Sequence, residues 1–174
     1  MRLVSLNART AQDAAMSPEV EVALIEISHP DLEAPIRLSS DSTVRLSSDP
    51  LSYGTRSNWR GADPETEPFL FVLISTVLPG EAEDAPASAQ LVLQALDARM
   101  AEVLRAVTTP AEVALAVVLA GTPDVIEQEW TGLQLTGAEG GAATVTLSLS
   151  REEIELEPFP STRMTRRNFP GLFV

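Results

Sequence analysis

The chain has 174 residues, 44% of them hydrophobic, and a formal net charge of −13. This length suits one domain with a sizeable core, which excludes general disorder, and the acidic balance argues against a nucleic-acid-binding surface because such a surface needs clustered positive charge. The absence of cysteine excludes disulfides, thiolate nucleophiles and thiolate metal sites.

The N-terminal part predicts a short peripheral helix followed by a strand. The helix is expected over residues 8–16, with Asn7 as its N-cap and Pro18 as its stop signal. Residues 19–28 alternate as a strand does, but the apolar phase changes within the run, which predicts a bulge or a switch of packing environment. The apolar residues of the two phases are Val20, Val22 and Leu24, and then Ile25 and Ile27.

Two short strands and a long polar segment follow. Residues 36–39 and 43–47 predict a pair of short strands. Residues 49–68 are polar and long for a loop, and loops of this length are usually functional or mobile. Either the segment is a solvated excursion anchored by Tyr53 and Trp59, or it contacts a neighbouring subunit through these two aromatic residues.

The middle of the chain alternates between apolar and polar runs. Residues 69–78 have apolar side chains on both phases, which predicts one strand buried on both faces. Residues 79–86 contain three carboxylates, and we interpret them as a solvated loop rather than a calcium site, since the spacing of these carboxylates lacks a calcium-binding pattern. Residues 89–95 predict a strand with Leu91 and Leu93 on one face. A helix is expected over residues 98–107, and its apolar stripe is assigned to the core.

The last part of the domain predicts further strands. Residues 112–119 place large aliphatic side chains on one face and mostly alanine on the other, which permits another layer to approach closely. Residues 122–129 are read as a turn-rich connection. Residues 130–136 and 143–150 predict a hairpin around glycine-rich residues 137–141. We therefore expect a mainly β fold, a barrel or sandwich of seven to eight strands with one flanking helix.

The C-terminal end differs from the rest of the chain in charge and composition. Residues 1–156 are assigned to a single β-rich domain and residues 157–174 to an extended arm, because three prolines in the arm forbid a continuous helix. No acidic residue occurs from Ser161 onward. We expect the arm to lie on its own domain or on a neighbouring subunit. Its candidate contact residues are Arg163, Arg166, Arg167, Phe169, Leu172 and Phe173.

The sequence carries no recognisable catalytic or cofactor motif. His29 is the only histidine and precedes a proline, as turn residues do. No serine lies in a Gly-x-Ser-x-Gly elbow, and no phosphate-binding glycine loop is present. We therefore expect a non-enzymatic protein without cofactor or metal. The N-terminus has no apolar signal core and no run approaches membrane-spanning length, so secretion and membrane insertion are not expected.

The C-terminal end carries a family resemblance. EPFP at residues 157–160 and NFPGLF at residues 168–173 resemble the C-terminal signature of a family of small tail proteins from long-tailed bacteriophages and prophages. Upstream features match in order, including ISHPDL at residues 27–32 and AQLVL at residues 89–93. The resemblance covers most of the chain, and the NFPGLF ending is its most specific part.

This resemblance implies a structural role at the tail tip. By analogy, the chain is similar to distal tail proteins and to the lambda-type minor tail protein M, which have a tail-tube-like β fold and form a hexameric ring between tail tube and baseplate hub. It implies a homo-hexamer in the virion, made in the host cytoplasm, that contacts the tail tube, hub and tape-measure proteins. The alternatives are a tail assembly or hub-associated accessory protein without its own ring and, remotely, a small cell-wall hydrolase.

Overall fold

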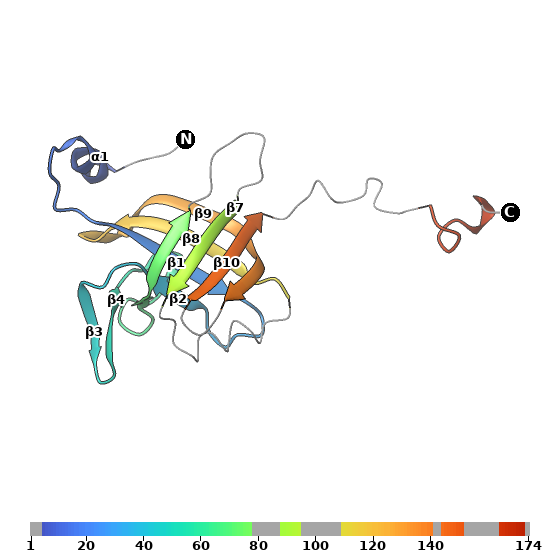
Figure 1. The fold of residues 1–174 in the computed structure, drawn as a ribbon, viewed down its shortest axis with the longest axis horizontal. Helices are drawn as coiled ribbons and strands as arrows, with labels where there is room; N and C mark the ends of the chain where they lie inside the picture. The colour runs from blue at the N-terminus through green and yellow to red at the C-terminus, as the bar shows by residue number, and fades with distance from the viewer. Residues whose placement is uncertain (1–4, 78–87, 95–108, 141–143, 152–163, 173–174) are drawn as a thin grey trace.

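The computed structural model describes residues 5–77, 88–94, 109–140, 144–151 and 164–172. These residues form one mixed sheet that curls into a half-barrel, with a single α-helix outside it (Figure 1). The mainly β prediction is therefore confirmed. The sheet has ten strands rather than the seven or eight expected.

The elements follow one another in a mostly antiparallel order. The helix is α1 (Leu6–Asp13). The strands are β1 (Glu21–Ser28), β2 (Ile36–Ser39), β3 (Val44–Ser48), β4 (Leu51–Thr55), β5 (Phe69–Phe71), β6 (Leu73–Val77), β7 (Ser88–Gln94), β8 (Glu112–Leu119), β9 (Thr122–Gly140) and β10 (Thr144–Arg151), with short 3-10 turns at Trp59–Gly61 and Pro170–Leu172. Their order in the sheet is β3-β4-β5-β2-β1-β8-β9-β10-β7-β6, and only the β2–β5 pair is parallel.

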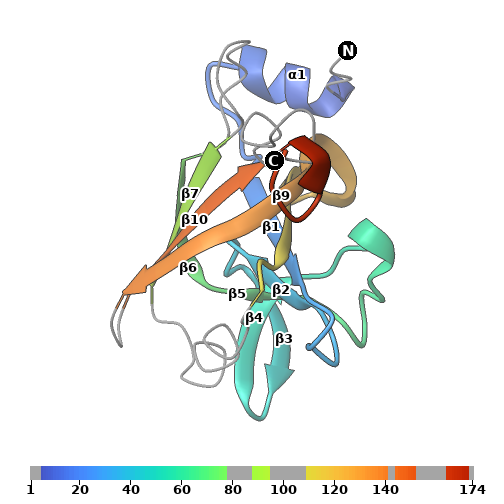
Figure 2. The same cartoon turned by 90° about the vertical axis from the view of Figure 1, so that its right-hand side faces the viewer.

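The curl of the sheet follows from one covalent connection. Strands β5 and β6 occupy the third and the last place in the strand order, yet Val72 alone joins them. The eight strands from β5 to β6 must therefore bend round until the two ends of this series approach each other (Figure 2). The bend gives the sheet an inner and an outer face.

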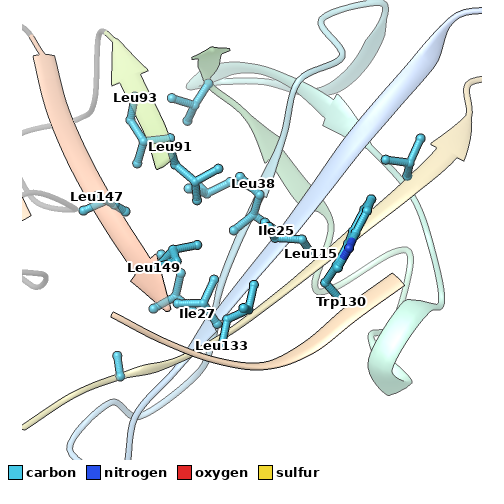
Figure 3. Packing of buried hydrophobic residues seen from close by; sticks show 14 residues of the cluster. Ile25, Ile27, Leu38, Leu91, Leu93, Leu115, Trp130, Leu133, Leu147 and Leu149 are labelled. Carbon is cyan, nitrogen blue, oxygen red and sulfur yellow. The ribbon is translucent and has the colours of Figure 1, made fainter. Parts of the chain in front are cut away.

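The inner face encloses the main hydrophobic core. Strands β1, β2, β7, β8, β9 and β10 direct aliphatic side chains toward one another there (Figure 3). The predicted apolar face of the strand at residues 89–95 is confirmed, since Leu91 and Leu93 are buried, and Leu147 and Leu149 of β10 are buried in the same core. The largest buried side chains of this core are Ile25, Ile27, Leu38, Leu91, Leu93, Leu115, Trp130, Leu133, Leu147 and Leu149.

A second, smaller core lies on the outer face. Residues 56–68, which we call the cover segment, lay Trp59 and Ala62 over the small side chains Ala114 and Ala116 of β8. The Trp59 ring also packs on Phe69, with the ring centroids 5.8 Å apart. The close approach predicted from the alanine face of residues 112–119 is thus observed, and the second layer is the chain's own cover segment.

Strand β1 serves both cores and has a continuous register with its neighbours. Val22 and Leu24 belong to the outer core, whereas Ile25 and Ile27 belong to the inner one. Neither pairing of β1 shows a register shift. Of the two explanations for the phase change, the switch of packing environment is therefore correct and the bulge is wrong.

Three predicted elements of the N-terminal half are corrected. The helix spans Leu6–Asp13 and its N-cap is Ser5, whose hydroxyl accepts the Ala8 N–H at 3.1 Å. The strands at residues 36–39 and 43–47 exist but do not pair with each other. The Asp41 carboxylate accepts the Thr43 N–H at 2.9 Å and its hydroxyl at 2.8 Å, which fixes a turn that directs β3 away from β2.

Two longer predictions are also wrong. Residues 69–78 do not form one strand, because Val72 donates its N–H to the Ser39 carbonyl at 3.0 Å and the chain then crosses to the opposite end of the sheet order. Residues 122–129 are the first half of β9 rather than a connection. Register shifts between β8 and β9 beside this half accommodate Pro123, which has no N–H. The helix at residues 98–107 and the loop at 79–86 lie outside the described residues.

Candidate functional site

The residues predicted to contact other subunits lie in three different settings. Tyr53 is on the β3–β4 hairpin, Trp59 is inside the cover segment, and four of the others lie in residues 164–172, which we call the C-terminal segment. The structure does not bring these three groups together. Arg163 and Phe173 lie outside the described residues.

Trp59 is a core residue, so its assignment as a subunit contact is corrected. Only 3% of its surface is exposed, and its indole N–H donates to Glu129 Oε1 at 2.9 Å. The ring sits over Ala114 and Ala116 because their small side chains leave room for it. The residue anchors the cover segment to its own sheet, as the alternative reading of residues 49–68 expected.

Tyr53 lies on a hairpin that carries several exposed apolar side chains. The β3–β4 hairpin projects from the body of the sheet (Figures 1 and 2), and 39% of Tyr53 is exposed on it. Leu51 and Val44 are exposed on the same hairpin. Strand β3 has no pairing partner on its outer side among the described residues. The hairpin therefore combines an open strand edge with apolar surface, which is a frequent arrangement at protein contacts.

Gly54 attaches this hairpin closely to the sheet. A Cβ atom at this position would lie 1.9 Å from the Phe69 carbonyl oxygen. No side chain fits there, so glycine is required where β4 crosses against β5. This requirement shows that the projecting hairpin is a fixed part of the sheet.

The C-terminal segment is a compact turn with an exposed surface. The Phe169 N–H donates to the Thr165 carbonyl at 2.8 Å, and the Leu172 N–H donates to the Phe169 carbonyl at 3.1 Å. The side chain of Leu172 is 63% exposed and that of Phe169 39% exposed. Arg166 and Arg167 are exposed as well. The ribbon of this segment lies away from the strands in Figure 1.

A charged cluster on the outer face holds the cover segment in place. The carboxylate of buried Glu26 in β1 accepts two hydrogen bonds from guanidinium groups. Arg37 Nε donates to its Oε2 at 3.0 Å, and Arg60 Nε donates to its Oε1 at 2.6 Å. Arg37 reaches Glu67 at 3.0 Å, and Arg60 reaches Glu112 at 3.6 Å. Both oxygens of Glu26 are thus paired with guanidinium groups. The cluster joins both halves of the cover segment to β1, β2 and β8, which is a structural task.

Arg60 adopts a backbone conformation that sequence reasoning did not anticipate. Its φ of 54° and ψ of 30° place it in the left-handed region, which non-glycine residues visit only when neighbouring structure fixes them. Here the ion pair with Glu26 and the packing of Trp59 provide that fixation. No spacing signal in the sequence identifies this cluster, because its members come from β1, β2, β8 and the cover segment, which are far apart in the chain.

His29 has a hydroxyl and a carboxylate nearby but the wrong hydrogen-bond polarity for a catalytic triad. Its Nε2 lies 2.5 Å from the Thr109 hydroxyl, and its Nδ1 lies 3.5 Å from Asp31 Oδ2. However, Nδ1 accepts the Asp31 backbone N–H at 3.1 Å. In the neutral ring Nε2 must then carry the proton and donate to Thr109, so it cannot act as the base for that hydroxyl. The group closes a turn, as predicted for His29.

Two further properties concern ligands and membranes. The described part of the chain contains no group of three or more histidine, aspartate or glutamate side chains arranged to hold a metal ion. Within the same residues, no helix is long and apolar enough to cross a membrane.

No protein-family model matches the sequence, and no curated protein matches it.

Proposed function

We propose that the protein is a structural component of a bacteriophage tail tip, a distal tail protein that forms a ring between the tail tube and the baseplate hub. The proposal rests on the resemblance of residues 157–160 and 168–173 to the tail-protein signature. The half-barrel with one outer helix is compatible with a tail-tube-like subunit, although a fold alone does not define a function.

One observation in particular supports a ring-forming role. The chain exposes apolar side chains at several separate places, including the β3–β4 hairpin, the C-terminal segment, and Val20 and Ile126 at the edge of the outer face. A ring is built from head-to-tail contacts, in which each copy presents two different surfaces. Two unlike exposed apolar surfaces on one chain meet this requirement, whereas a protein that binds a single partner requires only one.

The localisation is tested on tail particles induced from the source strain. Immunogold labelling with antibodies against the protein is expected to mark the tip of each tail, and particles from a deletion strain provide the control. Labelling along the whole tube, or absence from purified particles, would contradict the proposal. A tip-located protein present in one copy would instead favour the hub-associated accessory role.

A further inference from the structure

The outer hydrophobic face of the sheet ends in an apolar margin that stays partly exposed, although Ser57 and Asn58 of the cover segment hydrogen-bond to Pro123 and Asp124 nearby. Val22, Val118 and Ile126 lie side by side on β1, β8 and β9. The first two are fully buried, whereas Ile126 is 37% exposed. Val20 continues the same face of the chain, since its carbonyl accepts the Ala120 N–H at 2.9 Å, and it is 53% exposed. We call Val20 and Ile126 the outer margin.

The surroundings of the outer margin are acidic. No arginine or lysine occurs in residues 10–36 or 106–150, which include β1, β8 and β9. Glu19, Glu21 and Asp124 are exposed and lie within two residues of Val20 or Ile126 in the sequence, and Asp124 Oδ1 also accepts the Asn58 N–H at 2.9 Å. The Glu19 carboxylate lies against Gly121 in the turn between β8 and β9, since a Cβ there would be 3.2 Å from Glu19 Oε2. A surface of this kind favours a ligand that is both basic and apolar.

The C-terminal segment has that chemistry. Arg166 and Arg167 provide positive charge in a stretch without acidic residues, and Phe169 and Leu172 provide exposed apolar surface. The backbone hydrogen bonds of this turn join residues 165–172 with one another, and the turn presents Phe169 and Leu172 at the surface. Charge and hydrophobicity of the segment and of the margin are therefore complementary.

We propose that the C-terminal segment of one copy docks on the outer margin of a second copy. Phe169 and Leu172 would cover Val20 and Ile126, and the arginines would face the acidic residues. Both surfaces are partly exposed in the same chain, and a contact between unlike surfaces of identical chains continues from copy to copy, forming a ring where the rotation between copies closes and a filament where it does not. The inference rests on the proposed function for its biological setting and names the contact that would build the ring.

The test uses two full-length variants, each with one damaged surface. Ile126→Glu places a charge in the margin, and Phe169→Asp places one in the segment. Each variant alone should lose self-association by about tenfold or more, since a buried aliphatic or aromatic side chain is replaced by a charge. An equimolar mixture should form a one-to-one dimer in sedimentation velocity, because one intact segment and one intact margin remain.

A matched control and a second pair make the test decisive. Leu73→Glu is the control. The Leu73 side chain is 54% exposed, as Val20 is 53% exposed, but it lies on β6 at the end of the strand order, away from β1, β8 and β9. This variant should leave self-association unchanged. If a charged variant fails to fold, Ile126→Ser and Phe169→Ser replace the pair. A mixture that stays monomeric, a Phe169 variant that associates like the wild type, or a wild type that is monomeric at all concentrations overturns the proposal.

The two proposals fail in different experiments. If the variant pair dimerises but antibodies do not find the protein at the tail tip, the docking contact stands and the function is wrong. If the protein marks the tail tip and both variants still assemble there, the function stands and this contact is wrong.

Discussion

The two faces of β8 close in different ways, although the same neighbours, β1 and β9, flank both. On the inner face, Val113, Leu115 and Val117 are buried by the curl of the sheet itself. On the outer face, Ala114 and Ala116 are buried by a short cover segment that depends on Trp59 and on the Glu26 ion cluster. The inner core is closed by the strands of the sheet, whereas the outer face leaves Val20 and Ile126 at its margin partly exposed.

The largest effect is expected from the inner face. Leu115→Ala should lower the free energy of unfolding by about 2–5 kcal/mol, because it leaves a cavity in a packed core. Urea unfolding followed by circular dichroism measures this change. Leu73→Ala, at an exposed position, is the control and should change stability by less than about 0.5 kcal/mol. Equal effects of the two substitutions would contradict the assignment of the inner face.

The outer face should respond to a substitution of the opposite kind. Ala116→Leu should destabilise by about 1–3 kcal/mol, since a larger side chain displaces the Trp59 ring that packs above it. Tryptophan fluorescence should shift toward the red as Trp59 becomes more exposed. Ala138→Leu, at an exposed position of β9, is the matched control. An unchanged spectrum and stability for Ala116→Leu would show that the cover segment does not seal this face.

A smaller effect is expected at the rim of the cover segment. Glu67→Gln removes the 3.0 Å ion pair with Arg37, but the Glu67 side chain is 43% exposed. Solvent screens such pairs, so the loss should be about 0–1 kcal/mol and should shrink with added salt. Thermal unfolding at low and high salt checks both points. A loss that is large and independent of salt would mean that Glu67 acts as part of the buried cluster.

The smallest effect concerns pH. The Glu65 N–H donates to Asp63 Oδ1 at 2.9 Å, and this hydrogen bond, with help from Thr66, holds the pKa of Asp63 below its ordinary value of 3.8. The resulting stability is present above the ordinary pKa and is lost as the pH falls through the lowered pKa. Asp63→Asn should therefore flatten the acid limb of the stability profile slightly. An identical acid limb in both proteins would exclude this contribution.

Strands with clean alternation were predictable from the sequence, and pairings across the sheet were not. The runs that became β7, β8 and β10 alternate because each has a packed inner face. Residues 69–78 read as one apolar strand because local pattern cannot reveal that Val72 carries the chain from one end of the sheet order to the other. Residues 122–129 read as a connection because Pro123 usually ends a strand, and here register shifts accommodate it.

The residues at possible contact surfaces were also only partly predictable from the sequence. The sequence offered Tyr53 and Trp59 as equivalent aromatic anchors of one polar segment. Only the fold separates them, because Trp59 meets the alanines of β8 while Tyr53 stays on the projecting hairpin. The basic and aromatic character of the C-terminal segment was predictable from its composition, whereas the exposure of Phe169 and Leu172 in the single chain was not. The outer margin was not, since Val20 and Ile126 come from distant parts of the chain.

We propose that copies of this chain form a closed ring through unlike surfaces. Native mass spectrometry of the full-length protein, combined with negative-stain class averages of the same sample, distinguishes such a ring from other assemblies. We expect a single dominant assembly of six chains, seen as a ring with six-fold symmetry. A monomer at every concentration, or a symmetric dimer that exposes the C-terminal segment, would contradict it.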